Sequence, residues 1–390
     1  MDLLVSLRVE QQPSLSRHPR SLGSRPGRLF RRLEPLLVEL GHRVVILPRP
    51  EIFPLAMDRT ATFGSSRPIH LAFSQPGDVR FLKGAYNIGV LQLTGADVQA
   101  APLAGDPFAD HKRLLGLFDE IWVGSAIERD VLVEAGLRNV QLISWPMAGD
   151  PASCDLGTIH VAWAAGGTSQ LEVRSLSSCL DASETARRIA ASVDGTQAGV
   201  DGSVLLGVFS RLDSRQAIEL FVACDDMQAF NDMRRRLQDR HRAHGICLVP
   251  PLDDAGTAGL CARMDFVVWA PRFAASSLFL LDAIASGCVP AIVAGHALSA
   301  RSNLVPASTL QAERISEVWE NPERAGRCGA SIASDDVRTA LESALAHSTN
   351  VVVGPQRDAL PWATSACDVA AVSRRIGQRL TTIRRLIADA

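Results

Sequence analysis

Short apolar runs alternate with amphipathic segments over the first part of the chain. A run of about four to eight apolar residues is typical of a buried strand, and apolar residues at helical spacing are typical of one helix face. Leucines at helical spacing from Leu29 to Leu40 predict a helix that ends at Gly41. Pro35 inside it predicts a kink or a later start. The runs that we interpret as strands are 3–9, 43–47, 69–73, 86–93, 120–123 and 140–145. Repeated strand–helix units of this kind predict a parallel, doubly wound sheet.

The same pattern returns near the middle of the second half. Residues 266–269 form a continuous apolar run, as expected of a parallel strand that is covered on both faces. Ser276 and Ser277 can cap a helix whose body is apolar nearly all round, and Gly287 is the expected stop. Residues 289–293 supply the next strand. A helix that begins at the edge of such a sheet offers free backbone N–H groups to an anion.

Between these two regions the pattern is weaker. Residues 148–202 are rich in glycine, serine, alanine and aspartate, and we interpret them as a link with added elements, a strand at 159–164 and a helix at 182–193. The second domain then begins with a strand at 204–209. The stretch that follows is short, so either 218–223 forms the next strand or that strand is missing.

Length and composition agree with two globular domains. The chain has 390 residues, of which 47% are hydrophobic and 21% charged. Its formal net charge of -2 gives no indication of a nucleic-acid partner. The eight cysteines are scattered without a CxxC pair, so we expect buried reduced thiols rather than disulfides or a metal site. The first residues become charged too early for a signal peptide, so a cytoplasmic location is expected, with at most peripheral contact at the inner membrane face.

The C-terminal segment has an amphipathic pattern. Its apolar face carries Val372, Ile376, Leu380, Ile383 and Ile387, with arginines around it. We predict a helix that packs through this face, and membrane docking through the basic side is the alternative.

Two motifs resemble GT-B glycosyltransferases, and in particular the retaining enzymes of glycosyltransferase family 4. Residues 118–125, Phe-Asp-Glu-Ile-Trp-Val-Gly-Ser, and the helix that ends at Ala135-Gly136 are similar to the end of that family's N-terminal domain. Arg272, Leu278 and the run 282–290, Asp-Ala-Ile-Ala-Ser-Gly-Cys-Val-Pro, resemble its donor-site signature.

The resemblance implies an α/β protein of the GT-B type, in which two Rossmann-like doubly wound domains face each other across a cleft. It places an N-terminal acceptor domain at 1–147 and a nucleotide-sugar domain at 203–365. Residues 148–202 would be the linker with its elaboration. Residues 366–390 would form a helix that packs back on the first domain.

The resemblance also implies where the donor would bind. The residues that would hold its diphosphate are Arg211, Arg215, Gln216, Arg272, Ser276, Ser277 and Leu278. Asp282 would reach the ribose hydroxyls. No metal ion or other cofactor is implied, so cations and backbone N–H groups would neutralise the diphosphate. No catalytic residue is indicated.

The first domain would hold the acceptor, at Gly23, Arg25, Gly27 and Thr94. The arginine-rich segment 17–32 could receive an anionic acceptor such as a lipid-linked diphosphate or an acidic glycan. A solvated loop is the alternative, because helix N-termini disfavour cations unless an anion is present.

Three positions depart from the family pattern. Ala274 stands where the family has a glutamate, Gln216 replaces a lysine, and Thr94 replaces a carboxylate. We therefore hold two hypotheses. The first is a glycosyltransferase that moves a sugar from a nucleotide sugar to a glycan, lipid-linked or small-molecule acceptor, with retention of configuration by resemblance. The second is a catalytically impaired relative that acts as a binding or assembly subunit beside a partner glycosyltransferase. A nucleotide-binding protein without sugar transfer is a third alternative.

Overall fold

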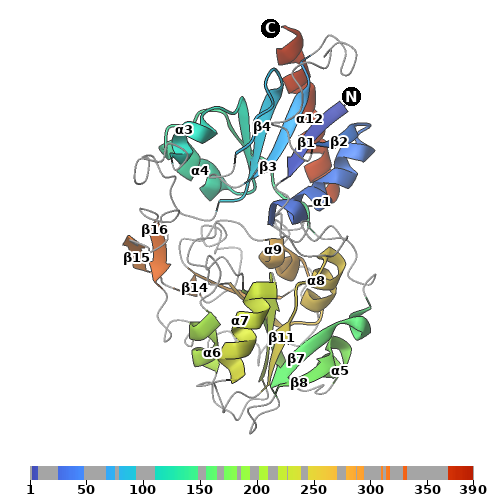
Figure 1. The fold of residues 1–390 in the computed structure, drawn as a ribbon, viewed down its shortest axis with the longest axis vertical. Coiled ribbons are helices and arrows are strands. Elements are labelled where there is room, and N and C mark those ends of the chain that lie inside the picture. The colour runs from blue at the N-terminus through green and yellow to red at the C-terminus, as the bar shows by residue number, and fades with distance from the viewer. Residues whose placement is uncertain are drawn as a thin grey trace. The chain divides into compact units, whose positions relative to one another are not determined.

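The structure is a computed structural model, and its chain divides into two compact units (Figure 1). The first unit comprises Met1–Pro146, Ser316–Cys328 and Ser365–Ala390, and the second comprises Met147–Ile315 and Gly329–Thr364. The residues that the structure describes are 2–7, 25–47, 67–74, 79–93, 110–147, 155–164, 171–181, 186–193, 202–209, 218–225, 227–238, 245–269, 278–286, 288–293, 309–310, 313–316, 328–331 and 368–389.

The first unit is built on a parallel sheet of six strands in the order β2-β1-β3-β4-β5-β6. The strands are β1 (Asp2–Leu7), β2 (Arg43–Leu47), β3 (Ile69–Ser74), β4 (Tyr86–Leu91), β5 (Glu120–Val123) and β6 (Val140–Leu142). The six strands predicted for this part of the chain are confirmed, with small shifts at their ends. Most of their side chains are buried, which explains the continuous apolar runs.

The described helices of this unit are α1 (Arg25–Glu39), α3 (His111–Leu115), α4 (Ala126–Glu134) and α12 (Val369–Ala388). Helix α1 buries the leucine face predicted from the sequence. It runs through Pro35 without a break, so the later start considered for it is wrong. Gly41 ends the segment with a positive φ of 78°, a conformation that glycine adopts without a steric penalty.

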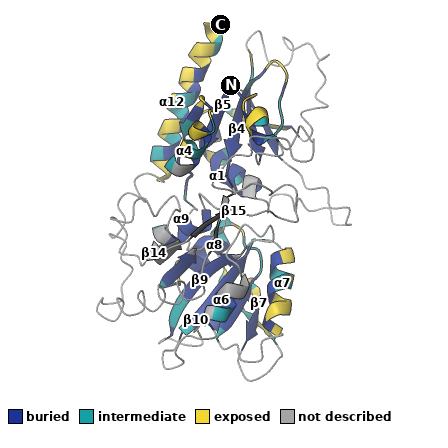
Figure 2. Ribbon diagram, turned by 90° about the vertical axis from the view of Figure 1, so that its left-hand side faces the viewer, coloured by how far each residue is buried: buried dark blue, intermediate teal, exposed yellow. Residues whose placement is uncertain are grey.

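Helix α12 belongs to the first unit and buries Val372, Ile376, Leu380 and Ile383. Figure 2 shows its outer face as exposed. The guanidinium of Arg379 donates two hydrogen bonds to the buried carboxylate of Glu120, Nε to Oε1 at 2.8 Å and Nη2 to Oε2 at 2.6 Å. Arg375 donates to the hydroxyl of Ser144 at 3.1 Å. Two of the basic residues of this helix therefore bind the first unit through hydrogen bonds.

A buried polar network joins β1, β3 and β4. The amide of Asn87 donates to the carbonyls of Leu82 and Ala85, and its Oδ1 accepts from the Leu82 N–H. Oδ1 must therefore also accept from His70 Nδ1, at 2.8 Å. In its neutral form His70 then accepts at Nε2 from the hydroxyl of Ser6, at 3.0 Å. The network satisfies polar groups that are shielded from water.

The second unit is built on an eight-stranded sheet in the order β14-β13-β12-β9-β10-β11-β7-β8. The strands are β7 (His160–Ala164), β8 (Glu172–Ser175), β9 (Arg187–Val193), β10 (Ile218–Cys224), β11 (Ile246–Val249), β12 (Phe266–Trp269), β13 (Val289–Val293) and β14 (Thr309–Leu310). The six strands β9 to β14 are parallel to one another. Strand β7 pairs antiparallel with β11 at one edge of these six, and β8 pairs antiparallel with β7. A separate two-stranded sheet pairs β15 (Glu313–Ser316) with β16 (Cys328–Ser331).

Helices cover both faces of the eight-stranded sheet. One apolar cluster includes residues of α6 (Gly202–Phe209) and α7 (Met227–Gln238). The opposite cluster includes residues of α5 (Leu176–Asp181), α8 (Asp254–Cys261) and α9 (Leu278–Ala285), with the turn η5 (Leu156–Thr158) beside it. Figure 2 shows the strands between these layers as buried. This is the doubly wound arrangement expected from the sequence.

Two elements predicted for the second unit are wrong. Residues 204–209, predicted as a strand, belong to helix α6, and the segment predicted as a helix at 182–193 contains strand β9. A short apolar run that is buried all round fits a helix as well as a strand, and the alanines of β9 favour a helix locally. Of the two alternatives for 218–223, the strand is confirmed as β10.

The described part of 148–202 supplies β7, β8, α5 and β9 to the second unit, and β9 lies between β10 and β12 at the centre of the sheet.

Candidate functional site

The second sheet has a topological switch point between β9 and β12. The chain proceeds from β9 outward through β10 to β11, and then returns to the other side of β9 to form β12, β13 and β14. In open α/β sheets, ligands bind outside the carboxyl ends of the strands at such a point. Helix α6 follows β9 and helix α9 follows β12, and the two pack on opposite faces of the sheet. The carboxyl ends of β9 and β12 are therefore the candidate site of this unit.

Helix α9 contributes two residues singled out by the sequence. Leu278 begins the helix and is buried, and Asp282 lies one turn later. Asp282 is the only charged residue of this helix, and only 2% of its surface is exposed. A carboxylate so deeply buried needs hydrogen bonds or a counter-charge, and Asp282 does interact with other groups. Sequence and structure thus agree on a buried acid near the start of the helix at the switch point.

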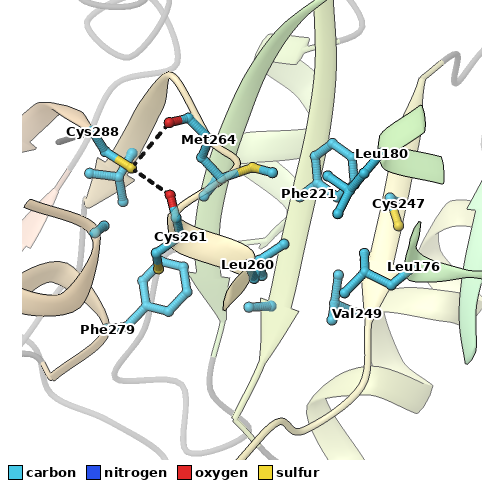
Figure 3. Packing of buried hydrophobic residues seen from close by; sticks show 14 of the residues in the cluster. Leu176, Leu180, Phe221, Cys247, Val249, Leu260, Cys261, Met264, Phe279 and Cys288 are labelled. Carbon is cyan, nitrogen blue, oxygen red and sulfur yellow. Dashed lines mark hydrogen bonds between the residues drawn. The ribbon is translucent and has the colours of Figure 1, made fainter. Parts of the chain in front are cut away.

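The end of α9 is held in place by a buried thiol. Cys288 Sγ donates to the carbonyl oxygens of Cys261, at 3.2 Å, and Met264, at 3.4 Å (Figure 3). Burial raises the pKa of this thiol to about 12, with a further increase from Asp265. Cys288 is therefore a neutral packing residue that joins the start of β13 to the end of α8.

The sequence missed two polar residues at the same edge. Ser192 is the penultimate residue of β9, and its buried hydroxyl donates to Oδ1 of Asp225 at 3.3 Å. Asp225 directly follows β10. They were overlooked because 182–193 was interpreted as a helix, so the end of β9 was not recognised as a sheet edge.

Several predicted donor residues lie outside the described residues, namely Arg211, Arg215, Gln216, Arg272, Ser276 and Ser277. The first three were expected in a loop after a strand at 204–209, and that segment is helix α6. The strand after them, β10, begins at Ile218, which pairs with Arg187 at the amino end of β9. The assignment of these three residues to the donor rests on the family resemblance and stays a prediction.

In the first unit, strands β1 and β3 flank the corresponding switch point. Of the predicted acceptor residues, Gly23 and Thr94 lie outside the described residues. Arg25 is the first residue of α1, where its side chain is not described, and Gly27 is buried in the first turn. Helix α1 packs on the end of β3, where the rings of Phe30 and Phe73 meet edge to face at 5.3 Å between centroids.

Arginines of α1 lie close to this edge. Arg28 and Arg32 are spaced one turn apart and are both largely buried, with 9% and 8% of their surface exposed. Arg32 donates to the carbonyl oxygen of Pro146 at 3.3 Å. Arg28 and Arg32 each make a further interaction within the protein. The helix brings positive charge to its own N-terminal half, and its first turn contains no acid.

Three buried polar atoms at the carboxyl edge of this sheet have no hydrogen-bond partner in the structure. They are Ser74 Oγ at the end of β3, Gln92 Oε1 after β4 and Trp145 Nε1 after β6. Each residue is at least nine-tenths buried. Buried polar atoms of this kind are usually satisfied by water or by a ligand. They are therefore candidate contacts for a hydroxyl-rich molecule.

Glu128 fixes the loop beside them. Its Oε1 accepts from the backbone N–H of Leu93 at 3.0 Å, and its Oε2 accepts from the hydroxyl of Ser125 at 2.9 Å. The Ser125 oxygen in turn accepts from the backbone N–H of Glu128 at 3.2 Å. Ser125 thus caps the start of α4, and Glu128 also holds the chain where it leaves β4.

Within the described ranges, no group of three or more histidine, cysteine, aspartate or glutamate side chains could hold a metal ion. None of the described helices is long and apolar enough to span a membrane.

Solved structures share this architecture over the length of the chain. Anabaena HepE, in complex with UDP-glucose, superposes with a TM-score of 0.60 at 11% identity and covers 98% of this chain and 100% of HepE. Sucrose-phosphate synthase from Thermosynechococcus elongatus gives a TM-score of 0.60 at 12% identity, with all of both chains covered. WaaG, a glycosyltransferase involved in lipopolysaccharide biosynthesis, gives 0.56 at 13% identity and covers 97% of this chain and 99% of WaaG.

No protein-family model and no curated protein matches the sequence. Similarity at this level of identity establishes a shared fold and leaves activity open. The chain has the GT-B fold, with two Rossmann-like units, as the sequence motifs led us to expect.

Proposed function

We propose that this protein is a glycosyltransferase that takes a sugar from a nucleotide-sugar donor and joins it to a hydroxyl group of an acceptor. One observation carries the proposal. A buried acid, Asp282, lies on the helix that begins at the switch point of the second unit, in a fold whose solved example HepE holds UDP-glucose. Such a position is where α/β sheets bind nucleotides.

In this proposal the second unit binds the donor. Asp282 accepts hydrogen bonds from the ribose hydroxyls, and the backbone N–H groups at the start of α9 hold the diphosphate. Arg272 supplies positive charge. Together these groups stabilise the negative charge that develops on the departing nucleotide diphosphate, so that no metal ion is needed.

The first unit binds the acceptor. Ser74 Oγ and Gln92 Oε1 can accept hydrogen bonds from sugar hydroxyls, and Ser74 Oγ and Trp145 Nε1 can donate hydrogen bonds to them. Arg28 and Arg32 bring positive charge near the same edge and favour an acceptor that also carries an anionic group, as a lipid-linked diphosphate or an acidic glycan does. The proposal of retained anomeric configuration rests on the resemblance to family 4. We also propose that the reaction takes place in the cytoplasm.

The donor proposal can be tested by calorimetry with UDP-, GDP- and dTDP-sugars. Asp282→Asn keeps the size of the side chain and removes its charge, so the affinity for the correct donor should fall about tenfold or more. Asp232→Asn is the matched control, because Asp232 lies on the outer surface of the same unit in an exposed pair with Arg235. The control should bind as the unaltered protein does. No binding of any nucleotide sugar at millimolar concentration to folded protein would exclude the function.

A binding or assembly role is the second candidate, favoured by the joint replacement of three family residues at Ala274, Gln216 and Thr94. The two candidates differ in turnover. Sugar transfer by the isolated chain, lost in Asp282→Asn, supports the enzyme. Donor binding without transfer to any acceptor, together with co-purification of an active glycosyltransferase, supports the assembly role.

A further inference from the structure

The second sheet ends in an edge strand with an exposed apolar side chain. Strands β7 and β8 continue the sheet past β11 in the antiparallel sense, and β8 is its last strand (Figure 1). None of the described strands pairs with the outer side of β8. Val173 in this strand is 71% exposed, the highest value among the described large apolar side chains. A strand edge of this kind is a template for pairing with another strand.

The pairing with β7 fixes which backbone groups of β8 face outward. In an antiparallel pair, opposite residues alternate between hydrogen-bonded and non-hydrogen-bonded pairs. The N–H of Leu176 donates to the carbonyl oxygen of Ile159, the residue opposite in the register, at 2.7 Å. Two and four positions earlier, Arg174 and Glu172 therefore also direct their N–H and C=O groups toward β7. The N–H and C=O groups of Val173 point away from β7, to the free edge.

The side chains of β8 place an acid and a base on one face of this edge. Nε of Arg174 donates to Oε2 of Glu172 at 2.8 Å, and the guanidinium carbon of Arg174 lies 5.8 Å from the ring centroid of Trp163. Both charged side chains stay partly exposed, Glu172 at 50% and Arg174 at 37%. Val173 lies on the other face, next to its cross-strand neighbour Ala162. The two charges are therefore held in a fixed order along the edge.

We propose that two copies of this chain associate reversibly by antiparallel pairing of their β8 strands about a two-fold axis through Val173. In this register the Val173 residues of the two copies exchange two N–H···O bonds, and the N–H of Ser175 donates to the carbonyl oxygen of Leu171 in the second copy. Glu172 stands opposite Arg174 of the second copy, and Arg174 stands opposite Glu172. The two eight-stranded sheets then become continuous.

The order of charges selects both the partner and the register. An edge with charges of one sign repels a second copy, whereas this edge carries both signs in the order that a two-fold axis matches. Two-fold registers centred on Glu172 or on Arg174 would place like charges opposite each other, which is destabilising. The inference does not depend on the proposed glycosyl transfer.

The size of the contact sets the expected strength. One short strand from each copy is a small contact compared with the standard interface of about 1,600 Å², so a reversible dimer is expected rather than a permanent one. We expect a Kd of about 100 µM.

Sedimentation velocity of the full chain, at concentrations from about 5 to 300 µM, measures the association. Arg174→Glu makes both charged positions of the edge acidic, and Glu172→Arg makes both basic. Each variant alone should self-associate about tenfold more weakly or less, because like charges then stand opposite each other. An equal mixture of the two variants should associate about as tightly as the unaltered protein, because every acid again meets a base.

Arg235→Glu is the matched control. It makes the same change of net charge at an exposed arginine of α7 that pairs with Asp232, and it should associate as the unaltered protein does. Hydrogen exchange adds a local readout, since the amide of Val173 should exchange more slowly at concentrations where the dimer forms. Far-UV circular dichroism checks that each variant is folded, and a mixed dimer itself requires two folded partners.

Three outcomes would overturn the proposal. The first is an unaltered protein that stays monomeric throughout the concentration range. The second is undiminished self-association of Arg174→Glu and Glu172→Arg, which would place the contact on another surface. The third is a mixture of these two variants that does not associate although each is folded.

Discussion

Replacing Arg379 by methionine should remove the cation that neutralises a carboxylate in the core of the first unit. Glu120 is 1% exposed, and Arg379 supplies two of its four side-chain hydrogen bonds. Trp122 Nε1 donates a third at 2.6 Å, and the hydroxyl of Tyr86 donates a fourth at 3.3 Å. Methionine fills much of the volume of arginine and keeps the apolar packing of α12. The variant therefore isolates the loss of charge and hydrogen bonds.

The expected cost follows from the burial of Glu120. Removing one partner of a buried ion pair costs about 3–5 kcal/mol, because the remaining charge is left without compensation. Trp122 and Tyr86 still bind Glu120, and Arg379 is partly exposed, so we expect the lower end, about 3 kcal/mol. For a unit of this size, that corresponds to a decrease of about 1 M in the urea midpoint of the transition that unfolds the first unit.

Urea unfolding of the full chain, followed by circular dichroism, measures this shift. Arg374→Met is the control on the exposed side of the same helix and should change stability by less than about 0.5 kcal/mol. The double variant Glu120→Gln with Arg379→Met has no buried charge and should recover most of the loss. If Arg379→Met costs no more than Arg374→Met, or if the double variant is as unstable as the single one, the account of this ion pair is wrong.

Three further predictions concern the first unit. Tyr86 is the only tyrosine of the chain, and burial, followed by the charge of Glu120, raises its pKa to about 12. The pKa of Tyr86, measured by spectrophotometric titration, should therefore move toward 10 in Glu120→Gln, and a value near 10 in the unaltered protein would contradict the geometry. Gly124→Ala should destabilise the unit by about 2 kcal/mol or more, because the added Cβ would lie 2.0 Å from Nε1 of the buried Trp145, and an unchanged thermal midpoint would show that this contact is absent. Burial lowers the pKa of His70 below that in the unfolded chain. The stability should therefore be independent of His70 titration above about pH 7 and should fall as the pH drops through 6.5, because only the unfolded state takes up the proton. Denaturant midpoints at a series of pH values should depend less steeply on pH in His70→Gln, and part of the remaining pH dependence is due to His42, whose pKa burial also lowers.

The elements around α9 were predicted from the sequence because local signals agree there. The apolar helix before β13 has local signals at both ends, two serines before its first turn and Gly287 after its last, which distinguish it from a strand. In the first unit the N-cap Ser125 is followed three positions later by Glu128, a sequence pattern that is typical of a helix start. At these places the local preference of the chain and its buried environment favour the same structure.

Around β9 and α6 the local signals and the final structure differ. The strand Arg187–Val193 contains arginines and alanines, and the helix Gly202–Phe209 contains valine and leucine in a continuous run. Ile189, Ala190 and Ala191 are fully buried between β10 and β12, so pairing on both sides decides their conformation. The consequence for the candidate site is direct. Assigning the first strand of the second unit to 204–209 placed the expected donor loop directly after that segment, and the end of β9 was not considered.

The sequence by itself determined the fold class, the strands of the first unit, and the identity of Asp282 and Leu278 as residues of a helix at a sheet edge. These conclusions depend on patterns within a few consecutive residues. Only the tertiary structure decided which strand stands at the centre of the second sheet and that Ser192 and Asp225 meet at its edge. Those facts join residues that are far apart in the chain, and their energies arise from burial and pairing that no local pattern contains.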